Sequence, residues 1–215
     1  MSSGGASVSS TLSGNDITTA KTSFSIWWEK IRVWLCTWEL YPILVVAAFL
    51  RLYRIDTTEF DDDQAVIFRM AHDAVVHGLL PATSNIASIR IYNPPAVVYL
   101  LMLPAALSAN PLWGAVFVGL LNVVAVFLTY IFVRRYYGRL AGSIAALLYA
   151  TAVKPIFYSR FMWQQNMIAP FVVLFLFALF WGVVERRKGW LVPALLLLGV
   201  LYQLHETTAV LVVAS

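Results

Sequence analysis

Long apolar runs separated by short polar connections make up most of the chain after about residue 30. The four longest runs cover 33–52, 111–133, 140–158 and 167–184. A helix of about 20 residues crosses the hydrocarbon core of a bilayer, which is about 30 Å thick, and these runs come close to that length. Two shorter apolar runs follow at 191–204 and 209–215. We therefore expect an all-α fold, a polytopic transmembrane helical bundle.

Two helices in the connection between the first two long runs should not cross the bilayer. The apolar segment 94–107 is too short to span and lies between proline-containing turns, which favours a juxtamembrane or re-entrant helix. The segment 62–77 has an amphipathic period and ends at Gly78. Its apolar face consists of two adjacent rows, Val66, Met70 and Ala74 and, beside them, Ile67, Ala71 and Val75. We expect this helix to lie on the membrane surface.

Composition supports a membrane protein and excludes several other classes. Apolar residues make up 60% of the chain, charged residues 12%, and the mean hydropathy is +0.76. A soluble domain of 215 residues cannot bury so much apolar surface. The single cysteine, Cys36, excludes an internal disulfide framework and a multi-cysteine metal site.

The basic pI of about 9.3 reflects topology, and we expect no nucleic-acid partner. Nine of the fifteen basic residues flank apolar runs on the side that we assign to the cytoplasm, in agreement with the positive-inside rule. Seven of the eleven acidic residues then lie on the opposite, extracytoplasmic side. The bilayer is therefore an expected partner, and the protein is expected in the plasma membrane of a bacterial cell.

The chain divides into two parts by composition. Residues 1–30 are rich in Ser, Thr and Gly, which is typical of a disordered cytoplasmic tail. Residues 31–215 form the transmembrane module, with an outer loop at about 53–110. Because the sequence ends inside an apolar run, we expect it to be the N-terminal part of a longer protein.

Three consecutive aspartates, Asp61 to Asp63, begin the amphipathic helix of the outer loop. Aspartate is a favoured N-cap, and the helix dipole stabilises acidic groups in the first turn. A functional alternative is that Asp63, with Asp62 beside it, supplies a general base at the membrane surface. A further alternative is that Asp61-x-Asp63 holds a divalent metal, although we expect no cofactor.

Cationic side chains near the outer face are candidates for binding the phosphate of a lipid-linked substrate. They are Arg54, Arg69, Arg90, Lys154 and Arg160. Each could instead be an interfacial anchor.

Six short motifs occur in the order and near the spacing of a known family. They are Asp63-Gln64-Ala65, Gly78-Leu-Leu-Pro81-Ala-Thr83-Ser84, Asn93-Pro94-Pro95, Arg134-Arg135-Tyr-Tyr-Gly138, Tyr158-Ser159-Arg160 and Gln203-Leu-His205. With these motifs, the chain from about residue 40 onward resembles the C-type (GT-C) membrane glycosyltransferases. The resemblance is to the family 39-like group, which includes protein O-mannosyltransferases and the lipid A aminoarabinose transferase.

The resemblance implies a polyprenyl-phosphate-linked sugar donor, an extracytoplasmic acceptor and a catalytic Asp, here Asp63. Two positions depart from the family pattern. Gln64 replaces an acid of the motif, and Gln165 or Asn166 stands where the second outer loop supplies another Asp. An amide can orient a hydroxyl but cannot act as a base at neutral pH.

These observations predict an inverting membrane glycosyltransferase. Asp63 would be the base, and Arg160, with Arg69 or Lys154, would bind the donor phosphate. The acceptor cavity is predicted to include Gln165, Asn166, Gln203 and His205, although His205 could equally be a packed histidine at a helix end. A transporter or channel subunit, with Glu39 and Lys154 along its pathway, is one alternative. A non-catalytic lipid-binding assembly protein is the other.

Overall fold

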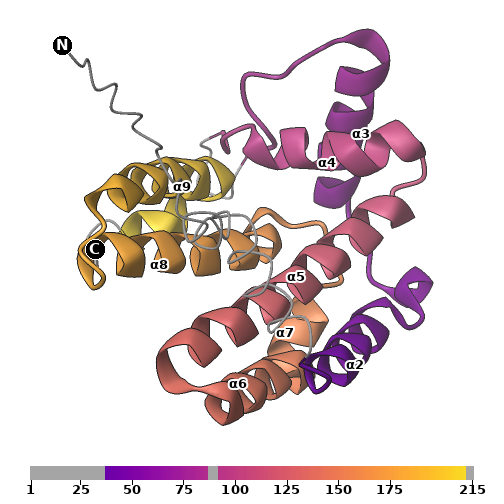
Figure 1. Ribbon diagram of the computed structural model, residues 1–215. Helices are drawn as coiled ribbons and strands as arrows, with labels where there is room; N and C mark the ends of the chain where they lie inside the picture. Colours follow the sequence, from indigo (N-terminus) through magenta and orange to yellow (C-terminus); the bar gives the residue numbers. More distant parts are fainter. Residues whose placement is uncertain (1–36, 87–91, 212–215) are drawn as a thin grey trace, which may run out of the picture. The chain divides into compact units, whose positions relative to one another are not determined.

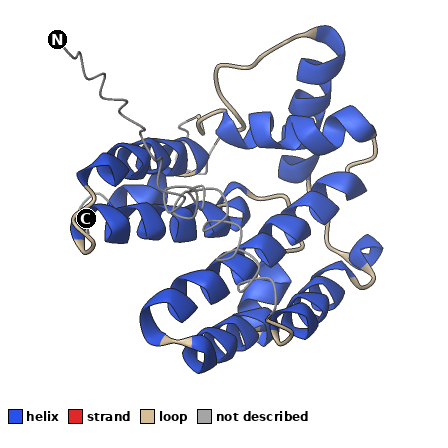
Figure 2. Cartoon of the chain, in the orientation of Figure 1, coloured by secondary structure: helices blue, strands red, loops and turns tan. Residues whose placement is uncertain are grey.

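The computed structural model describes residues 37–86 and 92–211, and within them the fold is all-helical (Figure 2). One isolated bridge between Ile86 and Tyr92 is the extent of strand pairing in these ranges. The expected all-α class is therefore confirmed, and the predicted tail at 1–30 lies outside the described residues. The chain separates into two units, Met1–Trp38 and Glu39–Ser215, and every described helix belongs to the second unit.

The second unit contains eight α-helices among the described residues, joined by short 3₁₀ turns (Figure 1). The helices are α2 (Leu40–Leu52), α3 (Asp62–His77), α4 (Ala96–Leu107), α5 (Leu112–Tyr137), α6 (Arg139–Thr151), α7 (Val153–Tyr158), α8 (Ala169–Val183) and α9 (Leu191–Leu204). The 3₁₀ turns are η1 (Ile55–Thr57), η2 (Gln164–Met167), η3 (Lys188–Trp190) and η4 (Glu206–Ala209).

One helix in the described part of the chain, α5, is long and apolar enough to cross a membrane. Three further apolar segments are shorter: α4, α8, and the run Lys188–Leu204 that includes α9. The helical character of the predicted runs is confirmed where they fall within the described residues, but the predicted number of full-length spans is not. In particular α2 has 13 residues, because its described helix begins only after Glu39.

The run 140–158, predicted as one span, is broken into α6 and α7. Ala152 between them has an extended backbone, with ψ at 127°. Pro155 explains the break, since proline lacks the N–H that would bond to Thr151 and its ring would clash with that carbonyl. The chain therefore turns at Ala152 and restarts as the short helix α7.

The amphipathic helix α3 has the predicted length and ends. Gly78 follows it in the left-handed conformation, with φ at 69°, which glycine adopts without strain. Its buried side chains include Ile67, Phe68 and Ala71, whereas Val66 is exposed. Ala74, Ile67 and Ala71 from the two predicted apolar rows are therefore buried, and the buried face centres on Ile67 and Ala71 because α3 packs against α4 and the start of α5.

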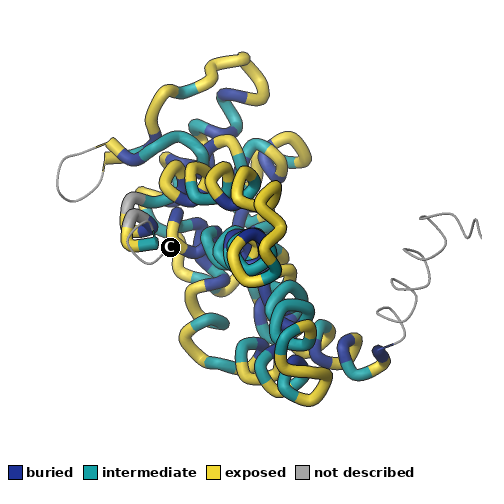
Figure 3. Tube along the Cα trace, turned by 60° about the vertical axis from the view of Figure 1, so that its left-hand side comes forward, coloured by how far each residue is buried: buried dark blue, intermediate teal, exposed yellow. Residues whose placement is uncertain are grey.

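Three apolar clusters hold these helices together. The first joins α3, α4 and the start of α5 around Leu101 and Met162. The second joins α2, α6 and the later half of α5 around Ala47 and Tyr130, and the third joins α8 and α9 around Leu201. Buried and exposed positions alternate along the helices in Figure 3, and many exposed ones are large apolar residues, as on a lipid-facing or partner-facing surface.

Candidate active site

The three aspartates at the start of α3 have different surroundings. Asp61 is the N-cap, and its side chain accepts a hydrogen bond of 2.9 Å from the backbone N–H of Gln64. Asp62 and Asp63 form the first turn, where the positive end of the helix dipole stabilises their charges. Helix capping therefore accounts for Asp61, while Asp62 and Asp63 remain exposed to solvent.

Asp63 belongs to a network of neutral side chains. Its Oδ1 accepts a hydrogen bond of 3.2 Å from Nδ2 of Asn85. Oδ1 of Asn85 in turn accepts from the side chains of Ser84, Asn93 and Gln164. Within the described ranges Asp63 has no ion pair, so the amide of Asn85 rather than a cation holds this carboxylate.

Gln64, which the resemblance aligns with an acid of the family motif, is buried. Its side chain is 2% exposed, its Nε2 donates to the backbone carbonyl of Glu59, and its Oε1 accepts from the backbone N–H of Met162. An ionised carboxylate has no proton to donate and could not make the first of these bonds. The amide therefore joins the start of α3 to the segment 158–166.

Arg160 connects the segment 158–166 to the turn that follows α2. Its guanidinium donates to the backbone carbonyls of Tyr53 and Arg54, at 2.9 Å and 2.6 Å, and to the hydroxyl of Thr58. Two of its five N–H groups have no such partner. The predicted phosphate ligand therefore also fixes the turn after α2.

A cavity of about 560 Å³ lies between α5, α6, α7 and the segment 158–166. Three residues that we predicted for the site, Lys154, Gln165 and Asn166, line it together. Its wall also contains Asn122, Tyr149, Tyr158 and Trp163. No Asp or Glu is among the described residues that line it, so the cavity has one cation and no carboxylate.

Asn122 places this cavity beside α5, the helix that is long and apolar enough to cross a membrane. It is 5% exposed and lies about 15 Å along α5 from the start of that helix, at 1.5 Å per residue. Its Nδ2 donates to the carbonyls of Val118 and Asn166, which leaves Oδ1 as an acceptor at the cavity. Polar residues at such positions in a membrane are costly and commonly functional.

The remaining predicted residues do not line this cavity. Arg69 is exposed on α3, and Gln203 is exposed on α9. His205 caps η4, where its Nδ1 accepts from the backbone N–H of Thr207. His205 therefore lies at the end of α9 with its ring hydrogen-bonded, and its role in an acceptor site stays a prediction. Arg90 lies outside the described residues.

Sequence reasoning missed Asn85, Gln164 and Asn122 as members of the site. Asn85 and Gln164 meet although 79 residues separate them along the chain. One signal was present, since an Asn inside the charge-free run of α5 is unusual. No group of three or more His, Cys, Asp or Glu residues in the described ranges is placed to hold an ion. The metal alternative at Asp61-x-Asp63, which requires two carboxylates, stays a prediction.

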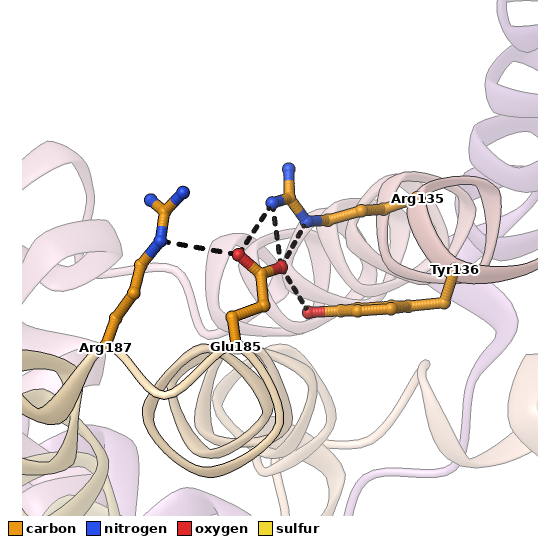
Figure 4. A network of polar contacts seen from close by, with 4 residues as sticks. All are labelled: Arg135, Tyr136, Glu185 and Arg187. Carbon is orange, nitrogen blue, oxygen red and sulfur yellow. Dashed lines mark hydrogen bonds and ion pairs between the residues drawn. The ribbon is translucent and has the colours of Figure 1, made fainter.

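The other end of α5 carries ion pairs. Glu185 accepts hydrogen bonds from Arg135 and Tyr136 and forms an ion pair with Arg187 at 3.5 Å (Figure 4). Hydrogen bonding from Arg135 lowers the pKa of Glu185. These contacts join the end of α5 to the connection between α8 and α9.

Glu39 links the start of α2 to α5 and α6. It precedes the helix rather than lying within it, as the apolar run had suggested, and its carboxylate pairs with Arg139. Tyr130 donates to it at 2.9 Å. The hydrogen bond from Arg139 is the main cause that lowers the pKa of Glu39 to about 2.

Comparison with known proteins adds one match. The family described as dolichyl-phosphate-mannose-protein mannosyltransferase matches residues 92–215, more than half of the chain. Neither a curated protein nor a solved structure matches. The matched region includes Gln164 and the cavity and begins after Asp63. The family is membrane-integral and has the C-type glycosyltransferase fold. The chain belongs to the dolichyl-phosphate-mannose-protein mannosyltransferase family.

Proposed function

We propose that the chain transfers a sugar from a polyprenyl-phosphate-linked donor to an acceptor on the extracytoplasmic side of a bacterial plasma membrane. The observation that carries this proposal is the position of Asp63, an exposed carboxylate that accepts a hydrogen bond from Asn85. Asn85 is bonded in turn to Gln164, whose neighbours in the segment 158–166 line the cavity. The paired arginines Arg134 and Arg135 at the far end of α5 support the orientation, because basic residues concentrate on the cytoplasmic side.

In this proposal Asp63 acts as the general base. Its carboxylate removes the proton of an acceptor hydroxyl or amine as that group attacks the anomeric carbon of the donor sugar. The new bond to the acceptor forms as the bond from the anomeric carbon to the phosphate oxygen breaks. The lipid phosphate leaves with the bonding electron pair, and the configuration of the sugar is inverted. Asp62 is the second carboxylate available in the same turn.

The donor head group is proposed to bind in the cavity that Lys154 lines. The Lys154 ammonium has no hydrogen-bond or ion-pair partner among the described residues and is free to bind a phosphate. Tyr149, Tyr158 and Trp163 offer ring faces, and Gln165 and Asn166 offer amides for sugar hydroxyls. The spare N–H groups of Arg160 and the exposed Arg69 remain candidates for a second phosphate contact.

The segment 158–166 links the proposed base to the proposed donor pocket. Gln164 is hydrogen-bonded into the Asp63 network, while its neighbours Trp163 and Gln165 line the cavity. Consecutive residues of one turn thus contact the Asp63 network and line the cavity. This arrangement gives a reason for the family resemblance at Tyr158-Ser159-Arg160, which begins the same segment.

The proposal is tested with membrane vesicles that contain the chain and with radiolabelled dolichyl-phosphate mannose as the probe. Transfer of label from lipid to a non-lipid acceptor is the expected result. Solute flux that is independent of the labelled lipid would favour a transporter. Saturable binding of the lipid without turnover would favour a lipid-binding assembly protein.

A further inference from the structure

Asn85 is the central residue of the network around Asp63. Its side-chain oxygen accepts three hydrogen bonds, from Ser84 at 3.4 Å, from Asn93 at 3.2 Å and from Gln164. Its side-chain nitrogen donates to Asp63. The amide therefore lies between the start of α3, the turn before α4 and the segment 158–166.

The hydrogen-bond partners of the Asn85 side chain determine which of its two terminal atoms is Oδ1 and which is Nδ2. Nδ2 of Asn93 also donates to the backbone carbonyl of Asn85 at 3.1 Å, which can only accept. The Asn93 nitrogen is thus fixed, and the oxygen of the Asn85 amide must face it. The nitrogen of Asn85 then faces the Asp63 carboxylate, which in its ionised form can only accept.

Backbone contacts hold Asn85 rigidly. The N–H of Ser84 donates to the carbonyl of Asn93 at 2.7 Å, and the N–H of Asn93 donates to the carbonyl of Asn85 at 3.0 Å. Ser84 and Asn93 are both buried. Asn85 therefore reaches the exposed Asp63 from a buried, hydrogen-bonded support.

We propose that Asn85 is a positioning residue, which holds the Asp63 carboxylate in the orientation needed to accept a proton. The inference rests on the proposed function, in which Asp63 is the base. A donor at 3.2 Å limits rotation of the carboxylate without neutralising it, unlike an arginine. Asp63 then presents its second oxygen to the acceptor.

Other charged groups lie on the elements around Asp63. Asp61 and Asp62 precede it in the same turn, and the segment 158–166 carries Arg160, which is bound to backbone carbonyls. Helix α4, which packs against α3, carries no charged residue. The neutral amide of Asn85 is therefore the direct partner whose replacement can be tested without removing an ion pair.

Asn85→Asp keeps the size of the side chain and its acceptor oxygen but places a second carboxylate next to Asp63. The three donors that bond to Oδ1 favour the ionised form at position 85, so the added proton goes to Asp63. We expect the acidic limb of the rate profile to move to higher pH by about one unit. In Asn85→Leu we expect kcat to fall about tenfold with an unchanged KM for dolichyl-phosphate mannose.

A second measurement does not depend on turnover. A carbodiimide reacts with protonated carboxyl groups, and mass spectrometry of the full chain from vesicles gives the pH of half-maximal labelling at Asp63. We expect this pH to rise by about one unit in Asn85→Asp. Asn110→Asp is the matched control, because Asn110 caps the start of α5 with its Oδ1 and an aspartate keeps that bond. It should leave the labelling of Asp63 unchanged.

Equal labelling profiles in Asn85→Asp and Asn110→Asp would overturn the assignment of Asn85. If the wild-type chain transfers no label, the proposed function fails, but the labelling experiment still reports on the contact between Asn85 and Asp63. If labelling shifts while kcat and the rate profile of an active chain do not, the contact exists without a positioning role, and the proposal is overturned.

Discussion

Carboxylates lie near both ends of α5, and their partners differ. The C-terminal end of α5, which carries Arg134 and Arg135, is its basic end. There Glu39 and Glu185 are bound by Arg139 and Arg135, and the pKa of each carboxylate is lowered. Near the start of the helix, Asp63 is bound by the amide of Asn85 and has no ion pair in the described part of the chain.

The difference separates structural acids from an acid that is available for chemistry. An arginine that forms a bidentate contact fixes a carboxylate and stabilises its charge, which makes it a poor base. An amide N–H orients a carboxylate by a hydrogen bond but brings no positive charge to neutralise it. Four predictions test this contrast.

The largest effect is expected for Asp63→Asn. Loss of a general base typically costs about 10²- to 10⁴-fold in rate, and we expect a loss of that size in label transfer. Glu185→Gln is the matched control from the basic end and should retain wild-type transfer. Full activity of Asp63→Asn in folded, membrane-inserted protein would contradict the assignment of the base.

The second effect concerns Gln64. Gln64→Glu introduces the acid that the resemblance implies at this position, but it buries a charge and loses the hydrogen bond to the Glu59 carbonyl. We expect a loss of stability of about 1–3 kcal/mol, measured by thermal unfolding in detergent. The exposed Gln165→Glu should leave the unfolding midpoint unchanged. Higher transfer by an equally stable Gln64→Glu protein would show that position 64 has a catalytic rather than a structural role.

The third effect distinguishes the cation in the cavity from the cations of the basic end. Lys154→Met should raise the KM for dolichyl-phosphate mannose about tenfold, the loss of one charge-assisted contact, while Lys154→Arg keeps the charge. Lys188→Met, at the connection before α9, should have a wild-type KM. An unchanged KM in Lys154→Met would remove the cavity from the donor site.

The smallest effect concerns the pH dependence of stability. The pKa of Glu39 falls from 4.5 to about 2 on folding, so its ion pair stabilises the fold fully above pH 4.5 and the contribution is lost as the pH falls through about 2. Glu39→Gln should therefore show a weaker decline of the unfolding midpoint between these pH values. The same decline in both proteins would mean that other acids are responsible.

Local signals in the sequence defined α3 well. The aspartate cap, the apolar period and Gly78 gave its length and both ends, because each acts within one or two helical turns. The break between α6 and α7 was missed. Pro155 was visible, but hydropathy alone does not distinguish a proline inside an apolar run from a residue that continues the helix.

A helical membrane protein, its basic end and an aspartate-rich helix start could be predicted from composition and short-range periodicity. Which polar groups meet depends on the tertiary packing. Asn85 reaches Asp63 and Gln164 across 22 and 79 residues, and Asn122 reaches Asn166 across 44. Such contacts depend on how α3, α5 and the segment 158–166 pack, and no local pattern encodes that packing.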